Sequence, residues 1–210
     1  MAYTTIDGSE ANFQVKLFAG TGTGGSTTAV TLDGSTNLSP DLVWIIHRNA
    51  AGNWKGVANT VRGTGKGLHS NEDDAEASSS DYLTAFGSDG FTVGANGSWG
   101  ANAVNYVSLC WKESATAGFD IVDYDGNGSA RTISHSLSAV PHAMFIKEYS
   151  HDTNWAAYHR SLGNDKFVPL NANTAPADTN NFNDTTPTSS VFSVGGGDQT
   201  NNSSRDYINF

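Results

Sequence analysis

The chain has 210 residues, of which 15% are charged and 37% hydrophobic, and its formal net charge is −10 at pH 7. Binding to nucleic acid or to an acidic membrane surface requires basic patches, so this balance argues against both. No apolar run approaches the ~20 residues that span a bilayer, so we expect no membrane insertion. The first residues have no basic segment followed by an apolar one, so we expect no secretory signal and synthesis in a reducing cytoplasm.

The first half of the chain consists of short runs in which apolar and polar residues alternate, the pattern of half-buried β-strands. Residues 1–12 are polar and are interpreted as an arm that contacts other proteins. After it, strands are expected at 13–18, 29–32, 42–47, 54–61, 66–68, 82–86, 91–94 and 104–111. No segment has the i, i+3, i+4, i+7 apolar spacing of an amphipathic helix, so helix content should be low.

The second half of the chain repeats the first. The apolar run that begins at Pro40 recurs 101 residues later at Pro141, and Asn53–Trp54 recurs at the same distance as Asn154–Trp155. The offset changes only within predicted connections, as expected for duplicated strands joined by variable loops. Matched aromatic positions are predicted to be core residues, namely Trp44 with Phe145, Trp54 with Trp155, and Phe91 with Phe192.

The repeat predicts an all-β protein of two tandem antiparallel β-sandwich domains, because ~100 residues are enough for a sandwich core. We expect repeat 1 at 13–112, a linker at 113–118 and repeat 2 at 119–210. The last strand of repeat 2 stops at Phe210, earlier than its counterpart, which suggests a longer chain or completion by a neighbour. The candidate assembly contacts are therefore Tyr3, Ile6, Tyr207, Ile208 and Phe210.

The segment Asp123–Tyr124–Asp125–Gly126–Asn127–Gly128 matches the first half of a calcium loop, with Asp123, Asp125 and Asn127 as the oxygen ligands. The twelfth position is Ser134, whereas an EF-hand needs a bidentate Glu there, and no helical patterns flank the segment. A turn of a β-hairpin explains the motif better. The acidic run 72–76 is similarly interpreted as a solvated face, with a bound cation as the alternative.

The sequence contains no catalytic motif that we can identify. The six histidines are scattered, and H-E-x-x-H, G-x-S-x-G and C-x-x-C are absent. The one cysteine, Cys110, lies in an apolar run and is predicted to be a small core residue. We therefore expect no enzymatic activity and no cofactor.

Trp99 lies in a glycine-rich segment with Asn96, where repeat 2 has Thr200. An aromatic ring in such a loop can stack on a sugar while asparagine side chains supply hydrogen bonds. Tyr149 and His151 form a second candidate glycan site of this kind. The alternative is that Trp99 packs over the end of its own sandwich or against a neighbouring subunit.

Several spaced motifs resemble a domain of unknown function that occurs in virion proteins of marine bacteriophages, including cyanophages. They cover nearly the whole chain and are Met1–Asp7, Pro40–Ile45, Val61–Gly63, Ser88–Gly94 and Asn105–Val107, with a sister pattern at Gly118–Phe119, Gly126–Gly128, Tyr158–His159, Ser161–Gly163 and Pro187–Phe192. The resemblance implies a lectin-like jelly-roll sandwich, a place on the virion and no known catalytic residues. His47 and Asn49 depart from the family's usual pattern.

Two functional hypotheses follow. The first is a structural virion protein, such as a tail-fibre, spike or capsid-surface component, which works by assembly and display with other virion proteins and forms a homo-oligomer, for which a trimer is our prediction. The second is a carbohydrate-binding module that recognises host-surface glycans.

Overall fold

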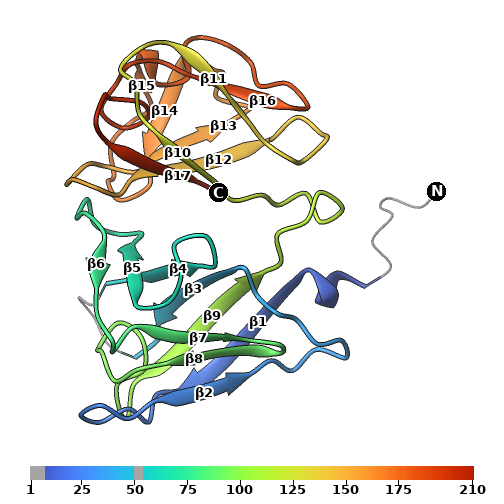
Figure 1. Cartoon of the computed structure of the whole chain (residues 1–210), viewed down its shortest axis with the longest axis vertical. Coiled ribbons are helices and arrows are strands. Elements are labelled where there is room, and N and C mark those ends of the chain that lie inside the picture. The colour runs from blue at the N-terminus through green and yellow to red at the C-terminus, as the bar shows by residue number, and fades with distance from the viewer. Residues whose placement is uncertain (1–7, 50–53) are drawn as a thin grey trace. The chain divides into compact units, whose positions relative to one another are not determined.

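The computed structural model describes residues 8–49 and 54–210, and the protein in it is all-β with antiparallel sheets (Figure 1). The only helical elements described are two 3₁₀ turns, η1 (Ser9–Ala11) and η2 (Asn180–Phe182). In the described part of the chain, none of the helices has the length and apolarity required to cross a membrane. Low helix content follows from the period-2 alternation of the sequence.

The described chain folds into two compact units. Unit 1 comprises residues up to His69 together with Ala77–Ala117, and unit 2 comprises Ser70–Glu76 together with Gly118–Phe210. The segment Ser70–Glu76 therefore lies within repeat 1 in the sequence but belongs to unit 2 in space.

Unit 1 is a sandwich of two sheets. The larger sheet has the order β1 (Phe13–Ala19), β9 (Asn105–Trp111), β3 (Leu42–His47), β4 (Gly56–Asn59), β5 (Lys66–His69), β6 (Ala77–Ser78). The smaller sheet has the order β2 (Thr28–Thr31), β8 (Gly90–Val93), β7 (Leu83–Gly87). The core between them contains residues of both sheets, among them Phe91 and Cys110.

Unit 2 has the same plan. Its larger sheet has the order β10 (Val122–Asp125), β17 (Asp206–Asn209), β12 (Ala143–Glu148), β13 (Ala156–His159), β14 (Lys166–Pro169), β15 (Ala177–Asp178). The smaller sheet pairs β11 (Arg131–Ser134) with β16 (Val191–Val194). Strand for strand this is the order of unit 1, except that η2 stands where unit 1 has β7. Phe192 lies in the core of unit 2, as its partner Phe91 does in unit 1.

The prediction that Trp54 and Trp155 are equivalent core residues is wrong for Trp54. Trp155 is 2% exposed, whereas Trp54 is 41% exposed and stacks on His69 with ring centroids 4.5 Å apart. Trp155 directly precedes β13, but Lys55 intervenes between Trp54 and β4. Because side chains alternate between the faces of a strand, one inserted residue moves the ring to the other side.

Trp44 was also predicted to be a core residue, and it lies outside the core. In β3 the core receives Val43 and Ile45, so Trp44 points to the opposite face of the sheet. The pairing register places apolar residues around it on three adjacent strands. We call this surface of unit 1 the apolar face; its members are Phe13, Val15, Leu17, Leu42, Trp44, Ile46, Val107, Leu109 and Trp111.

Candidate functional site

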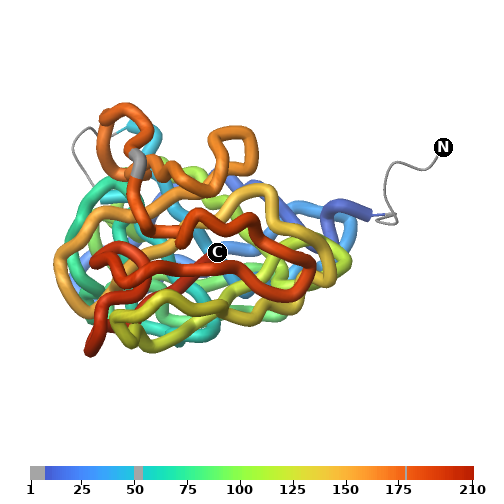
Figure 2. Tube along the Cα trace, turned by 90° about the horizontal axis from the view of Figure 1, so that it is seen from above, coloured from blue at the N-terminus to red at the C-terminus, as the bar shows by residue number. Residues whose placement is uncertain are grey.

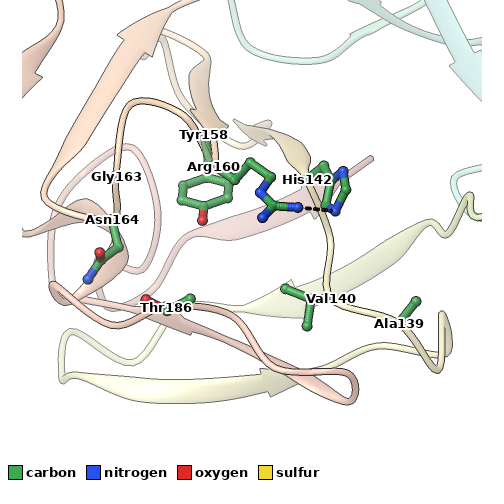
Figure 3. Close-up of a pocket in the computed structure, with 8 residues that line it drawn as sticks. All are labelled: Ala139, Val140, His142, Tyr158, Arg160, Gly163, Asn164 and Thr186. Carbon is green, nitrogen blue, oxygen red and sulfur yellow. Dashed lines mark hydrogen bonds between the residues drawn. The ribbon is translucent and has the colours of Figure 1, made fainter.

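Unit 2 contains a hollow of about 520 Å³ at the entry to β12 and the exit from β13 (Figure 3). Its walls combine apolar and polar side chains, with Arg160 and His142 on one side. The lining residues are Ala139, Val140, His142, Tyr158, Arg160, Gly163, Asn164 and Thr186.

The strand register brings Arg160 and His142 together. Ala143 pairs with His159 at the end of the β12–β13 ladder, so His142 and Arg160 are the next pair. Their backbones continue the ladder, because the Arg160 N–H donates to the His142 carbonyl at 2.9 Å. The Arg160 guanidinium also donates through Nη1 to His142 Nε2 at 2.7 Å. A guanidinium can only donate, so His142 Nε2 is the acceptor of this bond, which corresponds to the tautomer with N–H at Nδ1.

This geometry favours an anionic group as the ligand of the hollow. A guanidinium has five N–H donors in a planar fork that matches a carboxylate, sulfate or phosphate, and the bond to His142 uses one of them. Val140, which is 46% exposed, adds apolar surface, while Asn164 and Thr186 add polar groups. The Tyr158 ring is only 3% exposed, so it forms the floor of the hollow and presents no open face for stacking.

A second polar centre in unit 2 is Lys147, whose side chain is wholly buried. Its Nζ donates to the carbonyl oxygens of Thr153 at 2.7 Å and Asp73 at 3.0 Å. Burial lowers the pKa of Lys147 to about 8, against the opposing effect of Glu148, Asp73 and other nearby carboxylates. A buried ammonium is tolerated only where hydrogen bonds and charges compensate it, and both are present here.

The acidic segment Ser70–Glu76 supplies part of that compensation through its backbone, while Asp73 and Asp74 themselves are exposed, as expected for a solvated face. Besides the Asp73 carbonyl, which also accepts from the Thr153 N–H at 2.7 Å, the Glu76 N–H donates to the Tyr149 carbonyl at 2.8 Å. The Ala75 N–H donates to Asp152 Oδ1 at 2.9 Å. The cation beside this segment is therefore an amino group of the chain itself.

Glu148, the neighbour of Lys147, is wholly buried as well. Its carboxylate accepts from the backbone N–H groups of Ser150 and His151 and lies 3.5 Å from Arg205 Nη1. Charged hydrogen bonds of this kind hold a carboxylate in place and close the turn that follows β12. Sequence reasoning missed Lys147 and Glu148; the available signal was a charged pair where repeat 1 has Ile46–His47.

Trp99 is 0% exposed and stacks on Tyr82 with centroids 5.3 Å apart in the core of unit 1. A wholly buried ring cannot stack on a sugar from solvent, so the structure contradicts Trp99 as a glycan contact. Asn96 is engaged locally, since its Oδ1 accepts from the Ser98 N–H at 2.9 Å and its carbonyl from the Trp99 N–H. The loop closes the end of its own sandwich.

Tyr149 and His151 are near one another in sequence but serve different contacts. The Tyr149 hydroxyl donates to Asp123 Oδ1 at 3.0 Å, and burial together with Asp123 raises its pKa. The His151 side chain is 56% exposed, with Nδ1 3.6 Å from Glu148 Oε1. Neither residue lines the described hollow.

The calcium motif does not form a loop of convergent ligands. Asp123 and Asp125 are residues of strand β10, and Asn127 Oδ1 accepts from the Ser129 N–H and from Asn201 Nδ2, both at 3.0 Å. The hairpin interpretation is wrong too, because β10 pairs with β17 and β11 with β16, so the segment crosses between sheets. Over the described residues, no group of three or more His, Cys, Asp or Glu side chains is placed to hold a metal ion.

The predicted assembly contacts at the end of the chain are mostly internal. Tyr207 and Ile208 are 0% exposed, because β17 lies between β10 and β12 and is a central strand. Tyr207 stacks on Tyr124 at 5.3 Å, and Phe210 stacks on Trp155 at 6.2 Å. The end of the chain, which follows β17, is marked C in Figure 2. Tyr3 and Ile6 lie outside the described residues.

Comparison with known proteins gives one family. No curated protein and no solved structure matches the chain significantly. A family model described as "Domain of unknown function (DUF7483)" matches residues 8–210, which is nearly the whole chain and includes both units. The chain therefore belongs to the DUF7483 family of domains of unknown function.

Proposed function

We propose that this protein is a structural component of a bacteriophage virion, a tail-fibre, spike or capsid-surface part that works by assembly and display. The motifs that resemble virion proteins of marine phages support the proposal. So does the use of the matched rings Phe91 and Phe192, and of Trp99, as packing residues within the two units. In this role the chain has no catalytic activity and needs no cofactor, and its site of action is the particle.

The observation that carries the proposal is the apolar face of unit 1. On it Phe13, Val15 and Leu17 keep 37%, 49% and 57% of their surface exposed. The other members of the face, on β9 and β3, are half-buried or buried. Exposed apolar patches mark interaction sites, because water around them is released when a partner binds. A protein whose work is assembly requires such a surface.

The test is to locate the chain in purified particles of the phage whose genome encodes it. We expect mass spectrometry to find it in stoichiometric amounts and antibodies against it to label the particle in electron micrographs. Detection only in infected-cell lysate, with particles free of it after density-gradient purification, would overturn the proposal.

A second candidate function is recognition of an acidic glycan, and the Arg160–His142 pair favours it. The guanidinium fork suits a uronate carboxylate or a sulfate ester. Repeat 1 has Asp41 and Thr60 at the equivalent positions, where the Thr60 hydroxyl donates to Asp41 at 3.3 Å and Lys112 pairs with the same carboxylate at 2.8 Å, so unit 1 has an ion pair in place of the arginine. Only unit 2 is therefore expected to bind.

Calorimetric titration with oligosaccharides that carry carboxylate or sulfate groups, and with neutral ones of equal length, tests this candidate. We expect binding of the acidic set alone, and its loss in Arg160→Ala. Arg48→Ala, which removes an exposed arginine from unit 1, is the matched control and should bind as the parent does. Equal weakening by both variants would indicate nonspecific charge attraction.

A further inference from the structure

Among the strands that the structure describes, β1 forms one edge of the larger sheet of unit 1 and pairs with β9. It is seven residues long, and its outward side chains Phe13, Val15 and Leu17 are the most exposed part of the apolar face. A long edge strand with exposed apolar side chains is a template for pairing with another chain. Its other face is occupied within the unit, since Gln14 bonds to Gly34 and Thr36, and Lys16 pairs with Asp33.

The backbone groups of β1 that point away from β9 belong to the same residues that carry the exposed side chains. Hydrogen bonds join Lys112 N–H to the Asn12 carbonyl and Gly20 N–H to the Val104 carbonyl, at the two ends of the β1–β9 ladder. In an antiparallel pair every second residue bonds to the neighbour. Residues 14, 16 and 18 therefore bond to β9, while the N–H and C=O groups of 13, 15, 17 and 19 point to the open edge.

The corresponding strand of unit 2 is protected where β1 is not. Strand β10 is four residues long and also lies at a sheet edge. By pairing register, Asp123 stands where unit 1 has Leu17, and Asp125 stands where unit 1 has Ala19. Charged residues and short length are the usual ways in which proteins prevent edge pairing. One repeat has this protection and the other lacks it, which points to a use for the β1 edge.

We infer that β1 binds the β1 strand of a second copy of this chain, in an antiparallel pair that joins the two larger sheets into one. The inference rests on the proposed assembly function and names the surface through which assembly begins. An antiparallel pair of identical strands is two-fold symmetric, so each N–H that points outward meets a C=O of the other copy. The product of this contact is a dimer, whereas the sequence analysis favoured a trimer.

Charge selects the register of the pair. With Val15 opposite Val15, the row reads Phe13 opposite Leu17, Val15 opposite Val15, and Leu17 opposite Phe13. Lys16 then faces Gln14 of the second copy. A register with the two-fold axis at Lys16 places Lys16 opposite Lys16, and like charges directly opposite one another destabilise a strand pair. The register centred on Val15 also places the outward backbone groups of 13, 15 and 17 opposite one another.

The exposed area fits a contact that is weak in isolation. Taking ~150–200 Å² for a fully exposed residue of this size, Phe13, Val15 and Leu17 leave roughly 250 Å² per copy in water. A stable interface buries ~800 Å² on each partner, so the strand pair alone is in the small, reversible class. Repetition of the contact in an assembly would add to it.

Cysteine cross-linking tests the contact. In Val15→Cys the two thiols of a pair lie opposite one another, within the ~4.4–6.8 Å Cα separation that a disulfide spans. Val61→Cys is the matched control, because Val61 is 45% exposed in the same unit and lies outside β1. The natural Cys110 is buried and its pKa is raised to about 12, so it stays unreactive. We expect Val15→Cys to form covalent dimers on mild oxidation at least tenfold faster than Val61→Cys.

Two further measurements separate strand pairing from random collision. Leu17→Asp, which copies the Asp123 of repeat 2, should reduce cross-linking in the Val15→Cys background at least tenfold. Hydrogen exchange of the parent chain should show the amides of Val15 and Leu17 slowing as protein concentration rises, while those of Lys16 and Phe18 are slow throughout. Equal cross-linking of the two cysteine variants, or exchange that is independent of concentration, overturns the inference.

Different results would contradict the β1 contact and the virion role. A chain found in particles whose Val15→Cys variant does not cross-link retains the virion role and loses the β1 contact. A chain that pairs through β1 but is absent from particles loses the virion role and retains the contact.

Discussion

The two units fill equivalent space in their cores with side chains from different elements, a loop in unit 1 and strands in unit 2. In unit 1 the ring of Trp99 comes from the loop before β9, and Gly56 and Gly67 leave room for it. A Cβ on either glycine would lie 2.9 Å from the Trp99 ring. In unit 2 the equivalent loop residue is Thr200, and the strands carry the bulk as Ala156 and Phe167.

The two repeats therefore share their strand order and the filled volume of their cores more closely than they share residue identities. Interiors are close-packed, so a large side chain in one place requires small ones opposite it. Thr200 is itself wholly buried, and its hydroxyl donates to the Asn181 carbonyl at 2.9 Å. A packing tryptophan in one copy is thus replaced by a hydrogen-bonded threonine in the other.

The largest effect is expected from Trp99. Trp99→Ala should lower the free energy of unfolding of unit 1 by about 3–5 kcal/mol, because it leaves a cavity between the glycines and Tyr82. Chemical denaturation followed by tyrosine and tryptophan fluorescence measures it. Trp99→Thr combined with Gly67→Phe copies unit 2 and should be more stable than Trp99→Thr alone. A double variant no more stable than Trp99→Thr would show that the two fillings are not equivalent.

The next comparison is between Trp155 and Trp54. Trp155→Ala should cost unit 2 about 3 kcal/mol, because the ring is buried against Phe210. Trp54→Ala should cost unit 1 about 1 kcal/mol or less, since it removes a half-exposed ring stacked on His69. Denaturation of both variants gives the two values. Equal losses would contradict the register difference between the repeats.

Lys147 should make the free energy of unfolding of unit 2 depend on pH, whereas repeat 1 has the non-titrating Ile46 at the matched position. Lys147→Met should cost about 1–3 kcal/mol at pH 7, because it removes the Lys147 donor from the Thr153 carbonyl and leaves the Asp73 carbonyl with the Thr153 N–H alone. The pKa of Lys147 falls from 10.5 to about 8 on folding, so above about 8 the unfolded chain holds more protons than the folded one. The free energy of unfolding contributed by Lys147 should therefore rise between about pH 8 and 10.

The difference between parent and Lys147→Met isolates this contribution. Burial raises the pKa of Tyr207 to about 12, so the folded state keeps a proton that the unfolded state loses above about pH 10, and both proteins should lose stability there. The difference should be constant below about pH 8 and grow above it. A difference that shrinks with rising pH would contradict the lowered pKa of Lys147.

The smallest effect is expected at the edge of the sheet. Leu17→Asp should change the free energy of unfolding of unit 1 by about 0.5 kcal/mol or less, because 57% of Leu17 is exposed. Thermal unfolding at low protein concentration measures it. A loss of several kcal/mol would mean that Leu17 is covered within the unit, and that β1 is not the unprotected counterpart of β10.

Much of the fold was predictable because its signals are local. Strands expected at 13–18, 42–47 and 104–111 are observed at Phe13–Ala19, Leu42–His47 and Asn105–Trp111. Strand β6 was missed because its two residues lie at the end of an acidic connection without alternation. The candidate site was harder, since His142 and Arg160 are 18 residues apart and meet only through the register of β12 with β13.

The sequence by itself determined the all-β class, the doubling and the approximate position of most strands, because period-2 alternation and a constant offset are written along the chain. Only the tertiary structure decided which face of a strand is covered. It buried Trp99, exposed half of Trp54, made β17 a central strand and left β1 at an edge. Alternation shows which residues share a face, but what lies against that face depends on strand register and on distant segments such as Ser70–Glu76.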